Sequence, residues 1–110
     1  MTFAEYQTGA LRTTNPGLDG RDRLLDAATG FAEEAGEVLG LIRKRTFQQR
    51  EVARDRLVEE LGDALWCLTV TAESLGISLE ELAAANLSKL AKRHPDGFRA
   101  PEQWSRAAKE

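Results

Sequence analysis

The chain contains the stretch Glu-Glu-Ala-Gly-Glu-Val-Leu-Gly-Leu-Ile at residues 33–42 and a near repeat of it, Glu-Glu-Leu-Gly-Asp-Ala-Leu-Trp-Cys-Leu, at residues 59–68. In each stretch two acids stand three residues apart, Glu34 with Glu37 and Glu60 with Asp63. Residues at this spacing lie on one side of a helix, about one turn from each other. The pattern therefore predicts two helices that each present a pair of carboxylates in one direction.

Glu34 and Glu60 stand at the border of an apolar stripe on their helices. At about 100° per residue, the apolar residues of each stretch fall along one side, and both glutamates fall at its edge. Acids at such a border can point into a cleft between packed helices. Clustered carboxylates repel each other unless a cation neutralises them, and oxygen-only ligands suit Mg²⁺ or Mn²⁺. The alternative is a pair of solvated acidic faces, which are common on helix surfaces.

Composition limits the classes of protein to which the chain can belong. Its 110 residues predict one domain, and its net charge of −3 gives no case for nucleic-acid binding. The single cysteine, Cys67, excludes an intrachain disulfide and fits a reducing cytoplasm. We expect it to fill a small interior space. The sequence has neither a signal peptide nor a run of roughly 18 apolar residues, so we expect a cytoplasmic protein with no membrane partner.

The apolar periodicity is helical almost throughout, and no segment alternates as a strand would. We expect helices over residues 3–13, from Asp19 or Asp22 to about Lys44, from about Glu51 to Leu75, and from the capping residue Ser78 to about Arg93. A short last helix could start at residues 100–102. The short connection near residue 47 makes the two long helices antiparallel neighbours. The predicted fold is all-α, an antiparallel bundle of four main helices.

Glycines inside the two long helices predict a place of close packing. Gly36 and Gly62 are costly in helix interiors, and both lie away from the acids in projection. We expect them to allow another helix to approach closely. Gly76 is a suitable residue to end the third helix.

The two acidic stretches, followed by Asn-Leu-Ser-Lys-Leu-Ala-Lys-Arg at residues 86–93, resemble the MazG-like nucleoside triphosphate pyrophosphohydrolases of the all-α NTP pyrophosphatase superfamily. The resemblance covers roughly residues 20–98 and implies a single MazG-like domain over residues 1–110. It implies Mg²⁺-dependent cleavage of a nucleoside triphosphate to the monophosphate and pyrophosphate, in house-cleaning of the nucleotide pool. It also implies a homodimer or homotetramer with a nucleotide pocket shared between subunits.

The resemblance assigns roles to the acids by motif. Glu34, Glu37, Glu60 and Asp63 match the metal ligands. Glu33 matches a residue that helps bind a further metal or activates the attacking water. We therefore expect a catalytic role for Glu33 beside a carboxylate site for Mg²⁺.

The fourth expected helix supplies the polar and basic side chains. Asn86 and Lys89 match the polar pair that faces the triphosphate, and their three-residue spacing puts them on one face. Lys89 can offset phosphate charge as a point cation, so we expect it to be catalytic as well as substrate-binding. Lys92 and Arg93 continue this basic end, either as substrate contacts or as charges that complement the helix dipole.

Aromatic residues are candidates for contact with the base. Trp66 lies off the apolar stripe of its helix and needs a partner, which could be a neighbouring subunit, the first helix or the nucleotide base. Phe3, Tyr6 and Gln7 could contribute to a base pocket across a subunit boundary, or could dock the first helix. Because Trp66, Val70 and Leu25 lie outside the main apolar arcs, we expect a homo-oligomer of two or four chains.

Other functions stay open. A di-iron bundle would carry Glu-x-x-His, and a P-loop enzyme would carry a glycine-rich run ending in Gly-Lys-Ser or Gly-Lys-Thr; both motifs are absent. A non-catalytic helical oligomerisation module is the alternative from another class, and it would not depend on a divalent metal. Phosphoribosyl-ATP pyrophosphohydrolase, a relative within the superfamily, is a second alternative that a substrate screen would separate.

Overall fold

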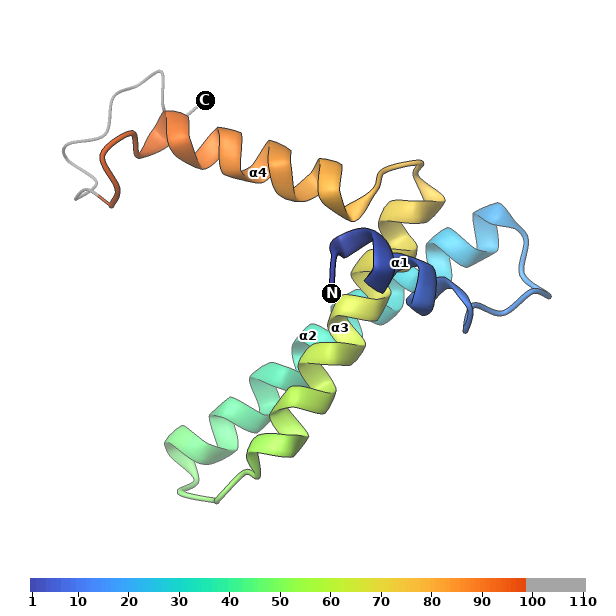
Figure 1. Cartoon of the computed structure of the whole chain (residues 1–110). Helices are drawn as coiled ribbons and strands as arrows, with labels where there is room; N and C mark the ends of the chain where they lie inside the picture. The colour runs from blue at the N-terminus through green and yellow to red at the C-terminus, as the bar shows by residue number, and fades with distance from the viewer. Residues whose placement is uncertain (99–110) are drawn as a thin grey trace.

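The computed structural model describes residues 1–98 and contains helices α1 (Phe3–Leu11), α2 (Gly20–Phe47), α3 (Arg54–Ser74) and α4 (Leu79–Arg93), with no regular strand in those residues (Figure 1). The predicted all-α class and its four main helices are confirmed. No helix between residues 1 and 98 is long and apolar enough to cross a membrane. The short helix expected from residue 100 lies outside the described residues.

Local signals explain most helix ends. Thr2 caps α1 in a capping box with Glu5, Asp19 caps α2, and Ser78 caps α4 through the Glu81 N–H. At the end of α3, Gly76 has a φ of 73°, and the Ile77 N–H donates to the Ala72 carbonyl at 2.9 Å. This pattern is a Schellman motif, and it confirms the expected end of the third helix.

Three predicted boundaries are displaced. Helix α1 ends at Leu11 instead of residue 13. Helix α2 continues to Phe47 instead of ending near Lys44, and α3 begins at Arg54 instead of near Glu51. The residue before α3 is Ala53, which makes no side-chain capping bond. Because the start of α3 carries no polar cap, the sequence held no local signal for it.

Helices α2 and α3 form an antiparallel hairpin, which is the main packing unit (Figure 1). Small residues let the two helices approach closely: a Cβ added to Gly30 would lie 3.0 Å from Cys67 Sγ. Cys67 is buried, as predicted for a small interior residue. A Cβ at Gly36 or Gly62 would meet no atom within 4 Å, so the close approach inside the chain occurs at Gly30 and not at the two predicted glycines.

Helix α1 lies across α3 and ties α4 to the hairpin. The Gln7 side-chain amide donates to Glu73 Oε2 at 3.0 Å and accepts from the Leu79 N–H at 3.1 Å. Leu79, the first residue of α4, is buried. Beyond this first turn, α4 runs away from the hairpin, and its Leu87 is 68% exposed (Figure 1). Within one chain, α4 therefore contacts mainly α1 and leaves the side of the hairpin open.

Candidate metal centre

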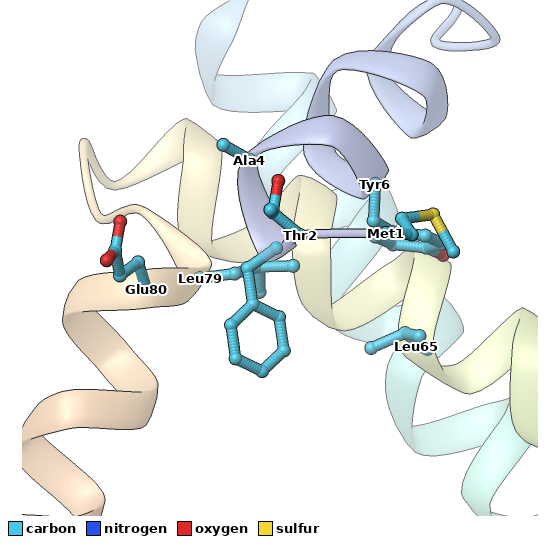
Figure 2. A pocket seen from close by; sticks show the side chains of 8 residues that line it. Met1, Thr2, Ala4, Tyr6, Leu65, Leu79 and Glu80 are labelled. Atoms are coloured by element: carbon cyan, nitrogen blue, oxygen red, sulfur yellow. The ribbon is translucent and has the colours of Figure 1, made fainter.

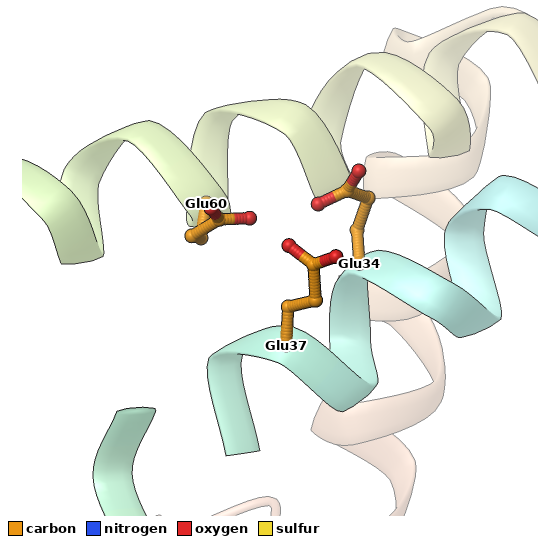
Figure 3. Close-up of side chains that lie close together, drawn as sticks. All are labelled: Glu34, Glu37 and Glu60. Carbon is orange, nitrogen blue, oxygen red and sulfur yellow. The ribbon is translucent and has the colours of Figure 1, made fainter. Parts of the chain in front are cut away.

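Three of the predicted carboxylates meet between α2 and α3. Glu34 and Glu37 project from α2 and Glu60 projects from α3 toward the same space (Figure 3). One oxygen from each of the three lies within 4.8 Å of the others. The three-residue spacing on α2 and the antiparallel packing of α3 produce this arrangement. We call Glu34, Glu37 and Glu60 the carboxylate cluster.

Burial makes this cluster unfavourable without a cation. Glu60 is only 8% exposed, and Glu34 is half-buried. The Oε2 atoms of both residues are shielded from solvent and have no hydrogen-bond partner. Buried carboxylate oxygens are normally hydrogen-bonded or bound to a metal. These two oxygens and the all-oxygen donor set therefore fit a hard divalent ion.

The same crowding shifts the proton affinity of the acids. The pKa of Glu34 is raised to about 7, mainly because its carboxyl group can share a proton with Glu60. Burial and the negative charges of Glu37 and Asp63 raise it further. Glu60 also raises the pKa of Glu37. Sharing a proton with the carboxyl groups of Glu37 and Glu34 lowers the pKa of Glu60 itself. Metal-free, the cluster thus holds a proton near neutral pH, which is the behaviour of acids that share a site.

The other predicted acids lie beside the cluster and not in it. Asp63 is exposed and is not one of the three grouped residues, but its charge raises the pKa of Glu34. Glu33 is also exposed, and its charge raises the pKa of Glu37. Both acids therefore act electrostatically on the cluster, and their predicted roles as fourth ligand and as water-activating residue stay predictions.

The structure does not bring α4 to the cluster within one chain. Asn86, Lys89 and Lys92 are exposed, and Arg93 is half-buried near the end of the helix. All four lie on the part of α4 that runs away from the hairpin (Figure 1). Their predicted contact with substrate would thus need a second subunit.

Trp66 has a partner inside the chain. Its indole N–H donates to the Ala10 carbonyl at 3.1 Å and to Thr13 Oγ1 at 2.9 Å. Of the three partners considered for this ring, the first helix is the one the structure contains. Val70 is also covered, at 1% exposure, whereas Leu25 is exposed as expected. Trp66 and Val70 therefore no longer argue for an oligomer.

An apolar pocket opens between α1, α3 and the start of α4 (Figure 2). Its volume is about 600 Å³, and Phe3, Tyr6, Leu65 and Leu79 line it. Phe3 and Tyr6 were candidates for a base pocket, and both line this one. Gln7, the third candidate, instead bridges α3 and α4.

Arg56 was not among the predicted site residues. Its Nε donates to Glu60 Oε1 at 3.3 Å, one helical turn before the glutamate. The signal was present, because an arginine four residues before an acid on a helix is placed to pair with it. Arg56 is the one cation that the structure shows in contact with the cluster, within residues 1–98.

Comparison with known proteins agrees with this geometry. Residues 25–98 match the MazG nucleotide pyrophosphohydrolase domain, which takes in α4 and the whole hairpin except the first turns of α2. The chain is also similar to a protein of Bacillus subtilis (strain 168) known as the uncharacterized protein YvdC, with 33% identity over 75 residues. That similarity covers 56% of this chain and 66% of the relative, just under two thirds of its length. No solved structure matches the chain. By the domain match, which holds both acidic stretches, the chain belongs to the MazG nucleotide pyrophosphohydrolase family.

Proposed function

We propose that this chain is a Mg²⁺-dependent nucleoside triphosphate pyrophosphohydrolase that converts an NTP or dNTP to the monophosphate and pyrophosphate. The observation that carries the proposal is the convergence of Glu34, Glu37 and Glu60 within 4.8 Å, with two buried oxygens left unpaired, inside a MazG domain. House-cleaning of the nucleotide pool in the cytoplasm fits such an activity. The buried free thiol Cys67 fits that compartment.

The metal would be held by the carboxylate cluster with Asp63 as an additional ligand. Mg²⁺ is the expected ion and Mn²⁺ a substitute, since both prefer oxygen ligands. When bound, the cation neutralises phosphate charge at the bond that breaks. Two glutamates on α2 and one on α3 would hold the ion between the helices, and substrate phosphates would approach from the side of the hairpin that α4 leaves open.

Glu33 is the proposed acceptor of the proton from water. It is exposed and lies close enough to the cluster for its charge to raise the pKa of Glu37. In the hydrolysis, the water oxygen bonds to phosphorus, the α–β anhydride bond breaks, and pyrophosphate or the monophosphate leaves with the electron pair. One proton of the water passes to Glu33. Orientation of that water, not covalent chemistry, is the task of the protein here.

The remaining substrate contacts would come from a second copy of the chain. Asn86, Lys89, Lys92 and Arg93 lie on α4, away from their own cluster, so a homodimer or homotetramer is the arrangement that brings them to a triphosphate. Large apolar side chains on both elements are exposed and need cover: Leu39, Val58, Leu61 and Leu65 on the hairpin, and Leu87 and Leu90 on α4. In that assembly Trp66 and the pocket lined by Phe3 and Tyr6 are the candidates for the base.

A substrate panel tests this function. Pyrophosphate release is measured from standard and modified NTPs and dNTPs, and from phosphoribosyl-ATP, with Mg²⁺ and with EDTA. We expect turnover of nucleoside triphosphates that EDTA abolishes. Turnover of phosphoribosyl-ATP alone would replace the substrate class. No turnover of any nucleotide with Mg²⁺ or Mn²⁺ would favour the oligomerisation module.

A further inference from the structure

Arg56 and Glu60 form an ion pair at the edge of the carboxylate cluster. Arg56 Nε lies 3.3 Å from Glu60 Oε1, and the two side chains differ sharply in burial, at 59% and 10% exposure. The arginine thus reaches from solvent to a glutamate that is inside the hairpin. Its contact occupies one oxygen of Glu60 and leaves the other, Oε2, buried and without a partner.

Stability is a poor explanation for this pair. An ion pair between residues four apart on a helix contributes little to folding when one partner is largely exposed, because solvent screens it. Its geometric consequence is larger. A glutamate side chain has several rotamers, and a hydrogen bond to one oxygen selects among them. Groups that hydrogen-bond to a metal-binding carboxylate orient it and commonly change metal affinity by about 10–100-fold when removed.

We propose that Arg56 is a positioning residue of the cation site. Its guanidinium holds Glu60 Oε1 and thereby fixes the orientation of Glu60 Oε2 toward the metal. This role rests on the proposed function, since it requires that the cluster binds a divalent cation.

The sign of the change in metal affinity separates positioning from simple charge. If Arg56 acted only through its positive charge, it would repel a divalent metal ion, so removing that charge would tighten metal binding. If Arg56 instead holds Glu60 in place, removing the arginine side chain would weaken metal binding. The two effects oppose each other, so a loss of affinity means that positioning dominates.

Arg54 provides a matched control on the same helix. It is exposed, it makes no ion pair with any residue between 1 and 98, and it lies two positions from Arg56 on another face of α3. Arg54→Met removes the same charge at a similar place in the sequence. Arg56→Met removes the charge and the hydrogen bond, and Arg56→Lys keeps the charge with a different reach.

The experiment measures Mn²⁺ binding to the whole chain by electron paramagnetic resonance, with thermal unfolding in EDTA as a second readout. We expect Arg56→Met to weaken Mn²⁺ binding about tenfold, Arg56→Lys to restore part of the loss, and Arg54→Met to stay within about twofold of wild type. The unfolding midpoint in EDTA should be nearly unchanged in all three variants.

Unchanged or tighter Mn²⁺ binding by Arg56→Met would overturn the positioning role while the metal site itself stands. An equal loss in Arg54→Met would also overturn it, since the loss would then not depend on the hydrogen bond from Arg56 to Glu60. If the wild-type chain bound no Mn²⁺, the proposed function would fail, and the role of Arg56 with it.

Discussion

The middle of the α2–α3 hairpin and the exposed part of α4 carry the two halves of the expected site, and they differ in what surrounds them. In the hairpin, Glu34, Glu37 and Glu60 converge within 4.8 Å between two packed helices. On α4, Asn86 and Lys89 are exposed on a helix that leaves the hairpin after its first turn. One chain therefore contains a carboxylate cluster that could hold a metal ion, but it does not bring to that cluster the polar groups expected to face the phosphates. This difference favours a site whose second half comes from another subunit.

Removing a ligand from the hairpin half should have the largest effect. Glu60→Gln keeps the shape of the side chain but loses the charge that a cation needs, so we expect kcat/KM for pyrophosphate release to fall by roughly 10²–10³-fold. Mn²⁺ binding should weaken in parallel. Glu59→Gln is the matched control, because Glu59 is the exposed neighbour outside the cluster, and it should remain near wild type. Comparable losses in both variants would mean that the acidic surface as a whole, and not the cluster, supports activity.

The α4 half can be tested by complementation between two defective chains. Lys89→Ala should lower kcat/KM about tenfold or more, since it removes a phosphate charge partner. If sites form across a dimer, mixing Lys89→Ala with Glu60→Gln chains creates heterodimers with one intact site. A freely exchanged equal mixture should then recover about a quarter of wild-type activity. No recovery after subunit exchange, checked by light scattering, would place both halves of the site within one chain.

The pH dependence of metal binding tests the crowding of the acids. A metal binds the ionised carboxylates, and the pKa of Glu34 is raised to about 7, so Mn²⁺ affinity should fall up to about tenfold per pH unit below neutrality. A titration of Mn²⁺ binding from pH 8 to pH 5.5 measures this. Affinity that is flat down to pH 5.5 would contradict the shared proton.

The same proton affects stability in EDTA. The pKa values of Glu34 and Glu37 are raised on folding, so their stabilising contribution is complete at low pH and is lost as pH rises through about 7. The pKa of Glu60 is lowered, so Glu60 stays ionised in this range and adds no change. The metal-free chain should therefore unfold at a lower temperature at pH 8 than at pH 6. Glu34→Gln should reduce this difference, and Glu59→Gln should not.

The smallest effect should separate two glycines of α2. Gly36→Ala meets open space inside the chain and gains helix propensity, so we expect it to raise the free energy of unfolding by about 0.5–1 kcal/mol. Gly30→Ala places a Cβ 3.0 Å from Cys67 Sγ, and the resulting crowding should cancel that gain or reverse it. Thermal or urea unfolding of the two variants decides between these outcomes. Equal stabilisation by both would mean that the hairpin is not tightly packed at Gly30.

Sequence reasoning predicted the hairpin half well because its signals are local. Acid spacing and the apolar stripe predicted that Glu34 and Glu60 would border the helix contact, and the structure places both in the cluster. The start of α3 was misplaced because Ala53 gives no polar cap. The position of Gly30 against Cys67 depends on where two helices cross, which a projection of one helix does not contain.

The α4 half was harder to predict because the surface that covers the apolar side of α4 does not lie close to it in the sequence. The apolar pattern marks Leu87 and Leu90 as residues to be covered, but it does not say by which helix or which chain. The direction of α4 is set by its first turn, where Gln7 accepts the Leu79 N–H from a position 72 residues away in sequence. Trp66 likewise donates hydrogen bonds to Ala10 on α1 and to Thr13 just after it. Its position in the sequence alone did not distinguish this partner from a neighbouring subunit or a nucleotide base.

Hydrolysis of the α–β phosphoanhydride bond at the carboxylate cluster is tested most directly by identifying the products. Phosphorus NMR of a deoxynucleoside triphosphate incubated with the protein and Mg²⁺ should show the monophosphate and pyrophosphate growing together in equal amounts. Glu60→Gln under the same conditions should show neither at a comparable rate. Orthophosphate and a nucleoside diphosphate as products would mean attack at the γ-phosphorus and would contradict the account.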